Sequence, residues 1–187
     1  GNNRAEAFIY GEGNTSGQFQ VGAHNLAQVK TGGESSGNMA FQYQGENEIS
    51  IPFGEESLEF EVPGEISIHN VAYAFQNGSD NGSLQIQFGA FNRSKVVQDG
   101  DDNGALTVQY GMTNEAYILQ PGDDNIGMIK QFGFCNDGLI YQEGSENFSD
   151  IMQIGGGNDA TIKQFGDSGS GVVSQSGIAN SSLILQY

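Results

Sequence analysis

The chain has 187 residues, with 29 glycines, 23 acidic residues and six lysines or arginines, so its formal net charge is −17. That charge disfavours nucleic acid and anionic membrane surfaces as partners, because binding to either one needs basic side chains. The one cysteine, Cys135, excludes a disulfide framework, and the sequence has no run of about 18 apolar residues that would cross a bilayer as a helix.

An eleven-residue unit recurs from Asn3 to Gln186, with one slip. It reads Asn-x-small-x-apolar-x-Gln-x-Gly-x-x, and a strict short period predicts one structural element stacked on itself. Between Asn and Gln the side chains alternate in character, which is the two-residue period of a strand. The face that carries Asn, a small residue, Val or Ile, and Gln should lie inside. Each unit therefore predicts a strand of about seven residues and a turn of about four.

Two units make one coil of strand, turn, strand and turn. The sequence thus predicts an all-β fold, a narrow two-sheet β-solenoid with coils of about 22 residues, whose parallel strands stack about 4.8 Å apart. We expect these coils to continue from copy to copy into a cross-β fibre. Seventeen units would place nine strands in one sheet and eight in the other.

The first unit, in residues 1–13, is the poorest copy. Ala7 and Ile9 stand where later units carry a β-branched residue and glutamine. We expect this half-repeat to be irregular in a fibre, either displaced or spanning the junction between subunits. Residues 14–187 are expected to form a single β-solenoid domain of about eight repeats. In this phase Ser36 takes an asparagine position and Gln42 takes a glutamine position.

Residues 47–64 are an atypical apolar repeat within that domain. Apolar residues replace the inward polar set, namely Ile49, Ile51, Phe53, Leu58, Phe60 and Val62. Alternation persists, so we expect one more coil with an apolar interior. One extra residue enters between Pro63 and His69, and this predicts a bulge, because proline cannot donate to a strand ladder.

From Asn70 onward the repeat is clean, and its inward asparagines and glutamines should stack on their equivalents in the next coil. A buried amide without partners costs about 1–3 kcal/mol, but amides stacked in register donate to and accept from one another along the axis. The alternative, that Asn and Gly only mark turns, fits glutamine poorly, because glutamine has no turn preference. The clearest expected ladder positions are Asn81, Asn92, Asn103, Asn114, Asn125, Asn136, Asn147, Asn158, Asn180, Gln87, Gln98, Gln109, Gln120, Gln131, Gln142, Gln153, Gln164, Gln175 and Gln186.

Glycine follows the glutamines from Gln76 to Gln175 by two residues and should form the turn, where a positive φ is tolerated. The expected turn glycines are Gly78, Gly89, Gly100, Gly111, Gly122, Gly133, Gly144, Gly155, Gly166 and Gly177.

Alternate turns differ in chemistry, which predicts one acidic and one aromatic edge. The aromatic edge carries Phe88, Phe91, Tyr110, Met112, Phe132 and Phe134. The best-marked acidic turns carry Asp99, Asp101, Asp102, Asp123, Asp124, Glu143 and Glu146. Stacked carboxylates repel one another, so they would keep the chain soluble and slow premature stacking. The alternative is that they hold a hard cation such as calcium. In either case acid pH or added salt should speed assembly.

No catalytic set is visible, and we expect neither an enzyme nor a cofactor. His24 and His69 share the turn position just before the asparagine and would lie two coils apart, and Cys135 shares that position. The competing class is a monomeric β-helix such as a polysaccharide lyase, an adhesin or an ice-binding protein. Lyases need long loops around a cleft, whereas the turns here have about four residues.

Several segments resemble the curlin repeat, Gln-x-Gly-x-x-Asn-x-Ala-x-x-x-Gln. The clearest are 109–120 and 153–164. Curlins are subunits of curli fibres, which are secreted functional amyloids of the bacterial biofilm matrix. The resemblance implies an extracellular cell-surface location, a nucleator subunit and an outer-membrane secretion pore as partners. The chain departs from the family where Asn81, Asn103, Asn125 and Asn147 replace the family's serine.

Both ends of the sequence read as ordinary units, with no capping segment, so we expect each end to template another copy. The function expected is therefore a structural subunit of a secreted, curli-like fibre that assembles head to tail and supports adhesion. The alternative is a monomeric or cell-attached β-solenoid adhesin that could bind cations.

Overall fold

The computed structural model describes residues 2–32, 35–44, 47–53, 56–62 and 67–187, and all its regular elements are β-strands. Within this part of the chain, no helix has the length and hydropathy needed to cross a bilayer. The strands are β1 (Arg4–Phe8), β2 (Thr15–Gln20), β3 (Leu26–Thr31), β4 (Met39–Gln44), β5 (Asn47–Phe53), β6 (Glu56–Val62), β7 (Val71–Asn77), β8 (Gly82–Ala90), β9 (Arg93–Asp99), β10 (Gly104–Met112), β11 (Glu115–Gln120), β12 (Ile126–Phe134), β13 (Asp137–Glu143), β14 (Phe148–Gly156), β15 (Asp159–Phe165), β16 (Ser170–Ile178) and β17 (Ser181–Gln186).

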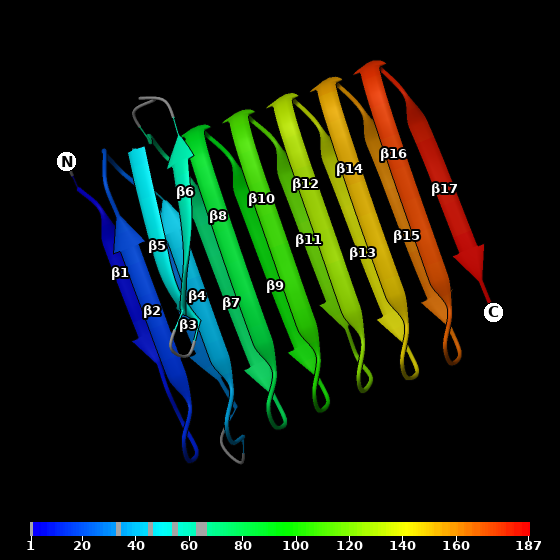
Figure 1. The fold of residues 1–187 in the computed structure, drawn as a ribbon, viewed down its shortest axis with the longest axis horizontal. Helices are drawn as coiled ribbons and strands as arrows, with labels where there is room; N and C mark the ends of the chain where they lie inside the picture. The colour runs from blue at the N-terminus through cyan, green and yellow to red at the C-terminus, as the bar shows by residue number, and fades with distance from the viewer. Residues whose placement is uncertain (1, 33–34, 45–46, 54–55, 63–66) are drawn as a thin grey trace.

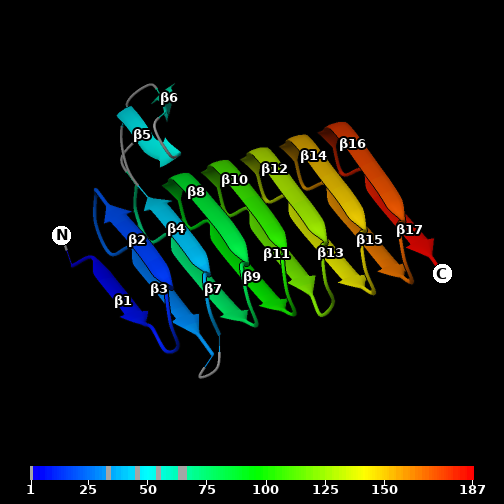
Figure 2. The same cartoon turned by 60° about the horizontal axis from the view of Figure 1, so that its bottom comes forward.

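Two parallel sheets form the solenoid (Figure 1). One sheet has eight strands in the order β1-β3-β7-β9-β11-β13-β15-β17, and the other has seven in the order β16-β14-β12-β10-β8-β4-β2. Successive strands alternate between the sheets, as Figure 2 shows in the turned view. The predicted all-β, two-sheet solenoid is confirmed.

The spacing of the coils is 22 residues from β7 onward. Leu106 of β10, for example, pairs with Leu84 of β8 and with Met128 of β12. Alternate residues of each strand point into the narrow interior, where small side chains and isoleucine leave room for the facing sheet. Ile118, Ile129 and Ile140 have no exposed surface and belong to one continuous apolar cluster.

The expected apolar coil at residues 47–64 is wrong. β5 and β6 pair antiparallel as a separate two-stranded hairpin, with Ile49 opposite Phe60 and Ile51 opposite Leu58. The hairpin is not part of the solenoid sheets, because β4 pairs directly with β8 and β3 pairs directly with β7. Alternation of apolar and polar residues suits a hairpin and a coil equally well, so the pattern alone did not separate them. The bulge was predicted between Pro63 and His69, and residues 63–66 of that segment lie outside the described residues.

The register shows where the hairpin enters the solenoid. Gln44 lies beside Gln20, and Asn70 follows Asn25 in the next coil. Four residues, Val21 to His24, separate Gln20 from Asn25. If Gln44 were joined directly to Ile66, four residues would likewise separate Gln44 from Asn70. Residues 45–65 are therefore an insertion into one turn. The two sheets consequently hold eight and seven of the described strands, and not nine and eight as expected.

The spacing of 13 residues from Asn25 to Asn38, in place of 11, also shifts the predicted phase. Asn38, and not Ser36, lies above Asn14, and its backbone N–H donates to Asn14 Oδ1 at 2.8 Å. Gln44, and not Gln42, follows Gln20 in the ladder. In the single chain β1 pairs in register with β3; its irregularity in a fibre stays a prediction.

Candidate functional site: amide ladders and turn edges

Two glutamine ladders run along the solenoid, one in each sheet. In the eight-stranded sheet each Nε2 donates to the next Oε1 at 2.6–3.1 Å. That ladder consists of Gln76, Gln98, Gln120, Gln142, Gln164 and Gln186. In the seven-stranded sheet the equivalent distances are 2.7–3.0 Å. That ladder consists of Gln20, Gln44, Gln87, Gln109, Gln131, Gln153 and Gln175.

From Gln44 onward, each ladder amide also ties the two sheets together. Gln131 Nε2, for example, donates to Glu115 O of the facing sheet at 2.7 Å, and Gln142 Nε2 donates to Ile126 O at 3.0 Å. The amides are therefore satisfied along the axis and across the interior, which is why they can be buried without the usual penalty. All donors point toward the C-terminal end of the stack, so the ladders have a direction.

The asparagines hold the turns instead of forming only a side-chain ladder. Asn114 Oδ1 accepts from the backbone N–H of Asn136 at 3.1 Å, and Asn114 Nδ2 donates to Gly133 O of the next coil at 3.0 Å. Some pairs add a direct amide contact, from Asn136 Nδ2 to Asn114 Oδ1 at 3.0 Å in the eight-stranded sheet and from Asn103 Nδ2 to Asn81 Oδ1 at 3.1 Å in the other. The same pattern of turn contacts recurs at Asn81, Asn92, Asn103, Asn125, Asn136, Asn147 and Asn158.

The turn glycines are required mainly by the close approach of neighbouring coils. A Cβ on Gly133 would lie 1.9 Å from Gly155 O, and φ at Gly133 is +123°. Gly122 lacks the positive φ that was expected, yet a Cβ there would still lie 2.1 Å from Gly144 O. The same obstruction by the next coil's glycine carbonyl holds at Gly78, Gly89, Gly100, Gly111, Gly144 and Gly155, whereas Gly166 and Gly177 have only contacts beyond 3 Å.

Sequence reasoning missed a second special position, the residue just before each asparagine. Ten non-glycine residues there have φ between 55° and 59°, His24, His69 and Cys135 among them, and Ser168, which precedes Gly169, shares this conformation. The left-handed conformation costs energy for a residue with a Cβ, and the hydrogen bonds of the following asparagine compensate for it. The position varies in residue type, so only its fixed place before Asn could have revealed it.

One rung of the ladder is defective. Gln76 Oε1 is buried and has no hydrogen-bond partner among the described residues. Thr31 stands at the equivalent position one coil earlier, and its hydroxyl donates to Tyr10 O at 2.9 Å instead. The unbroken part of this ladder therefore starts at Gln76, next to the insertion.

The acidic turns accept hydrogen bonds from the preceding coil. Asp101 Oδ1 accepts from Ser79 N–H at 2.7 Å, and Asp123 Oδ1 accepts from Asp101 N–H at 2.9 Å. Asp99 accepts from Asn77 Nδ2 at 2.8 Å. Elsewhere Glu143 accepts from the Tyr141 hydroxyl and Glu146 from the Ser168 hydroxyl, while Asp102 and Asp124 occupy the left-handed position. No three His, Cys, Asp or Glu side chains in the described ranges are grouped so as to hold a metal ion.

A second acidic column, which the sequence analysis did not identify, lies on the outer face of the eight-stranded sheet. Glu115, Asp137 and Asp159 stand in register on β11, β13 and β15. Partial burial, together with the carboxylates of Glu115 and Asp159, raises the pKa of Asp137 above its ordinary value.

The aromatic edge contains an unexpected stack. The rings of His24 and His69 lie 4.8 Å apart, and Phe91 follows at 5.0 Å from His69. The histidines were expected two coils apart, but they are neighbours because the insertion removes residues 45–65 from the stack. Phe88 packs with Tyr43 and Tyr110, whereas Met112 and Phe134 are more than half exposed.

Residues 100–133 and 136–166 match the family model of the curlin associated repeat. These segments lie within the part of the solenoid in which both ladders are unbroken, which also extends beyond them on either side. A search of curated proteins finds no sequence that matches the chain.

Proposed function

We propose that this chain is a curlin-family subunit of a secreted fibre. Its residues 100–133 and 136–166 match the curlin associated repeat, and its fold is a β-solenoid. Curlins are structural proteins and not enzymes. In this proposal copies of the chain stack head to tail into a functional amyloid of the extracellular matrix, which supports adhesion. A nucleator subunit and an outer-membrane secretion pore are its proposed partners, because curlins depend on both.

The observation that carries the proposal is the direction and continuity of the glutamine ladders. Every Nε2 donates in the same sense, from Gln20 to Gln175 in one sheet and from Gln76 to Gln186 in the other. Parallel strands in register likewise offer backbone donors and acceptors along the axis. A further copy added in the same orientation would repeat the same hydrogen bonds rung by rung.

The test is polymerisation of the purified chain. We expect fibres that bind amyloid dyes and show a meridional reflection at about 4.7–4.8 Å in fibre diffraction. A chain that stays monodisperse for days at high concentration would overturn the proposal and favour the solitary adhesin.

Matched variants connect polymerisation to the ladders. The double variant Gln109→Leu/Gln120→Leu breaks one rung in each sheet and should slow or abolish fibre growth. Gln28→Leu makes the same chemical change on the outer face of β3, where the side chain is half-buried, and should leave growth near that of the unmodified chain. Equal growth of all three chains would contradict a role for the ladders in assembly.

A further inference from the structure

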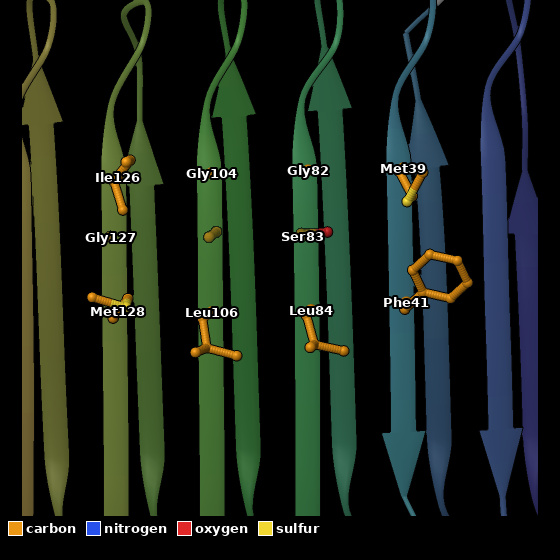
Figure 3. A pocket seen from close by; sticks show the side chains of 11 residues that line it. Met39, Phe41, Gly82, Ser83, Leu84, Gly104, Leu106, Ile126, Gly127 and Met128 are labelled. Atoms are coloured by element: carbon orange, nitrogen blue, oxygen red, sulfur yellow. The ribbon is translucent and has the colours of Figure 1, made fainter. Parts of the chain in front are cut away.

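The outer face of the seven-stranded sheet is apolar over β4, β8, β10 and β12. Two rows of residues run across these strands in register. One row forms a ridge of Phe41, Leu84, Leu106 and Met128. The other row, two residues earlier on each strand, consists of Met39, Gly82, Gly104 and Ile126. Figure 3 shows the ridge side chains beside the bare strand at Gly82 and Gly104, and the hollow they line has a volume of about 430 Å³.

Nothing within the single chain requires glycine at these two positions. Neither Gly82 nor Gly104 has a positive φ. A Cβ on Gly82 would meet no atom within 4 Å, and one on Gly104 would meet only Ile126 Cγ1 at an ordinary 3.8 Å. Glycine weakens a strand and often marks a place where another chain approaches closely. These two glycines therefore differ from the turn glycines, whose space is taken by the next coil.

The face also differs in charge from the other side of the solenoid. The eight-stranded sheet carries Arg93, Glu115 and Asp137 on its outer face in successive strands. On β8, β10 and β12 of the seven-stranded sheet, the outward residues include one charged side chain, Lys130, whose Nζ lies 2.9 Å from Asp150 Oδ2. Covering this face would thus leave no unpaired charge in the described part of it.

We propose that this face binds the same face of a second copy, so that two solenoid stacks pair side by side. A two-fold axis parallel to the stacking direction, midway between the two rows, would place each leucine ridge in the other copy's hollow. Such a contact is self-complementary, and both stacks keep the same strand spacing, so the fit repeats once in every copy along the fibre, as in a steric zipper. This inference rests on the proposed polymerisation.

The area of the face determines whether single copies or only stacked copies can pair. Four strands about 4.8 Å apart, each presenting about seven residues at about 3.3 Å, offer roughly 400 Å² per copy. A standard stable interface needs about 800 Å² per partner. Single copies should therefore stay unpaired, whereas stacked copies add their contacts along the fibre and pair.

The experiment measures mass per unit length of fibres by electron microscopy. Fibres of the unmodified chain should have twice the mass per length of one solenoid. In Gly82→Val/Gly104→Val the hollow is filled, and mass per length should fall twofold, while dye binding and diffraction are retained. Ser170→Val is the matched control, because Ser170 lies in the same row on β16, outside the hollow, and it should keep paired stacks.

Single-stack fibres from the unmodified chain would overturn this inference alone, and so would paired stacks in the double valine variant. If the valine variant fails to polymerise, the inference is tested with Gly82→Ala/Gly104→Ala instead. Each added methyl group fits the single chain, so this variant should still polymerise. Alanine should reduce the share of paired stacks, and an unchanged share would refute the inference. A chain that forms no fibres at all would overturn the proposed function and, with it, this pairing.

Discussion

The regular region, residues 81–187, and the irregular region, residues 2–77, are built from the same unit but have different interiors. In the regular region the position before each ladder glutamine on the inner face is mostly isoleucine, as in Ile129 and Ile151, and the coils repeat every 22 residues. In the seven-stranded sheet nearer the N-terminus the same position holds Gln18 and Gln42, and this short ladder continues to Gln85, with amide contacts of 2.7–3.0 Å.

The comparison teaches that the stack tolerates either chemistry if equivalent residues match. Glutamine upon glutamine is satisfied by hydrogen bonds, and isoleucine upon isoleucine by apolar contact. Thr31 and Gln76 do not match, and there one buried oxygen has no partner among the described residues. That mismatch lies in the region that also carries the long insertion.

The largest expected effect comes from emptying the isoleucine column of the regular region. Ile140→Ala removes a fully buried side chain from the continuous cluster and should lower the free energy of unfolding by about 2–5 kcal/mol. Val29→Ala, in a cluster of only three small residues, should cost less than half as much. Urea unfolding of both variants measures the difference, and equal costs would mean that the two interiors are packed alike.

Substituting a ladder glutamine should cause the second-largest loss of stability. Gln120→Leu deprives the buried Gln142 Oε1 of its donor, at about 1–3 kcal/mol, and it also removes the hydrogen bonds from Gln120 Nε2 to Gly104 O and Asn125 O. Gln76→Leu removes equivalent hydrogen bonds, to Gln98 Oε1, Met39 O and Asn81 O, but it also removes a buried oxygen that already lacks a partner, so it should cost less than Gln120→Leu. A larger loss of stability for Gln76→Leu would show that the defect at this rung is not real.

Removing the insertion should have a small effect on the solenoid. Deleting residues 45–65 joins Gln44 to Ile66 and restores a turn of the length found between Gln20 and Asn25. Because β4 pairs with β8 and β3 with β7 without the hairpin, stability should change by less than about 1 kcal/mol. Loss of cooperative unfolding in the deleted chain would show instead that the hairpin is part of the core.

The smallest effect concerns pH and the acidic column of the regular region. A raised pKa at Asp137 means that the folded chain holds this proton more tightly than the unfolded chain does. The stabilisation is then complete below the ordinary aspartate pKa and is lost as pH rises through the raised value. The urea midpoint should therefore rise on acidification from neutral pH toward the ordinary carboxyl range, in line with faster assembly in acid. Asp137→Asn should have a flatter profile, and an identical profile would remove Asp137 as the cause.

The sequence was enough to predict the solenoid and the inward amides, because a fixed distance from Asn125 to Gln131, repeated many times, leaves few other folds. It was not enough to place Asn38 and Gln44. The segment Gln42-Tyr-Gln44 offers two glutamines two residues apart, and either one keeps the same face inward. Only the paired strands decide between the two registers.

The hairpin and the left-handed turn position could not be predicted from the sequence for other reasons. Alternating Ile49, Ile51 and Phe53 fit any strand, and which strand pairs with which depends on contacts far apart in the chain. At the left-handed position the residues are as different as His69 and Cys135, so residue type gives no signal for the conformation.

Solid-state NMR of fibres labelled at glutamine tests the central claim most directly. If amides stack in register within and between copies, Nε2 of one glutamine and the side-chain carbonyl of the next will show strong through-space contacts, and these will persist in fibres mixed from separately ¹⁵N- and ¹³C-labelled chains. Fibres in which no such contact is detected, even in uniformly labelled chains, would contradict the account.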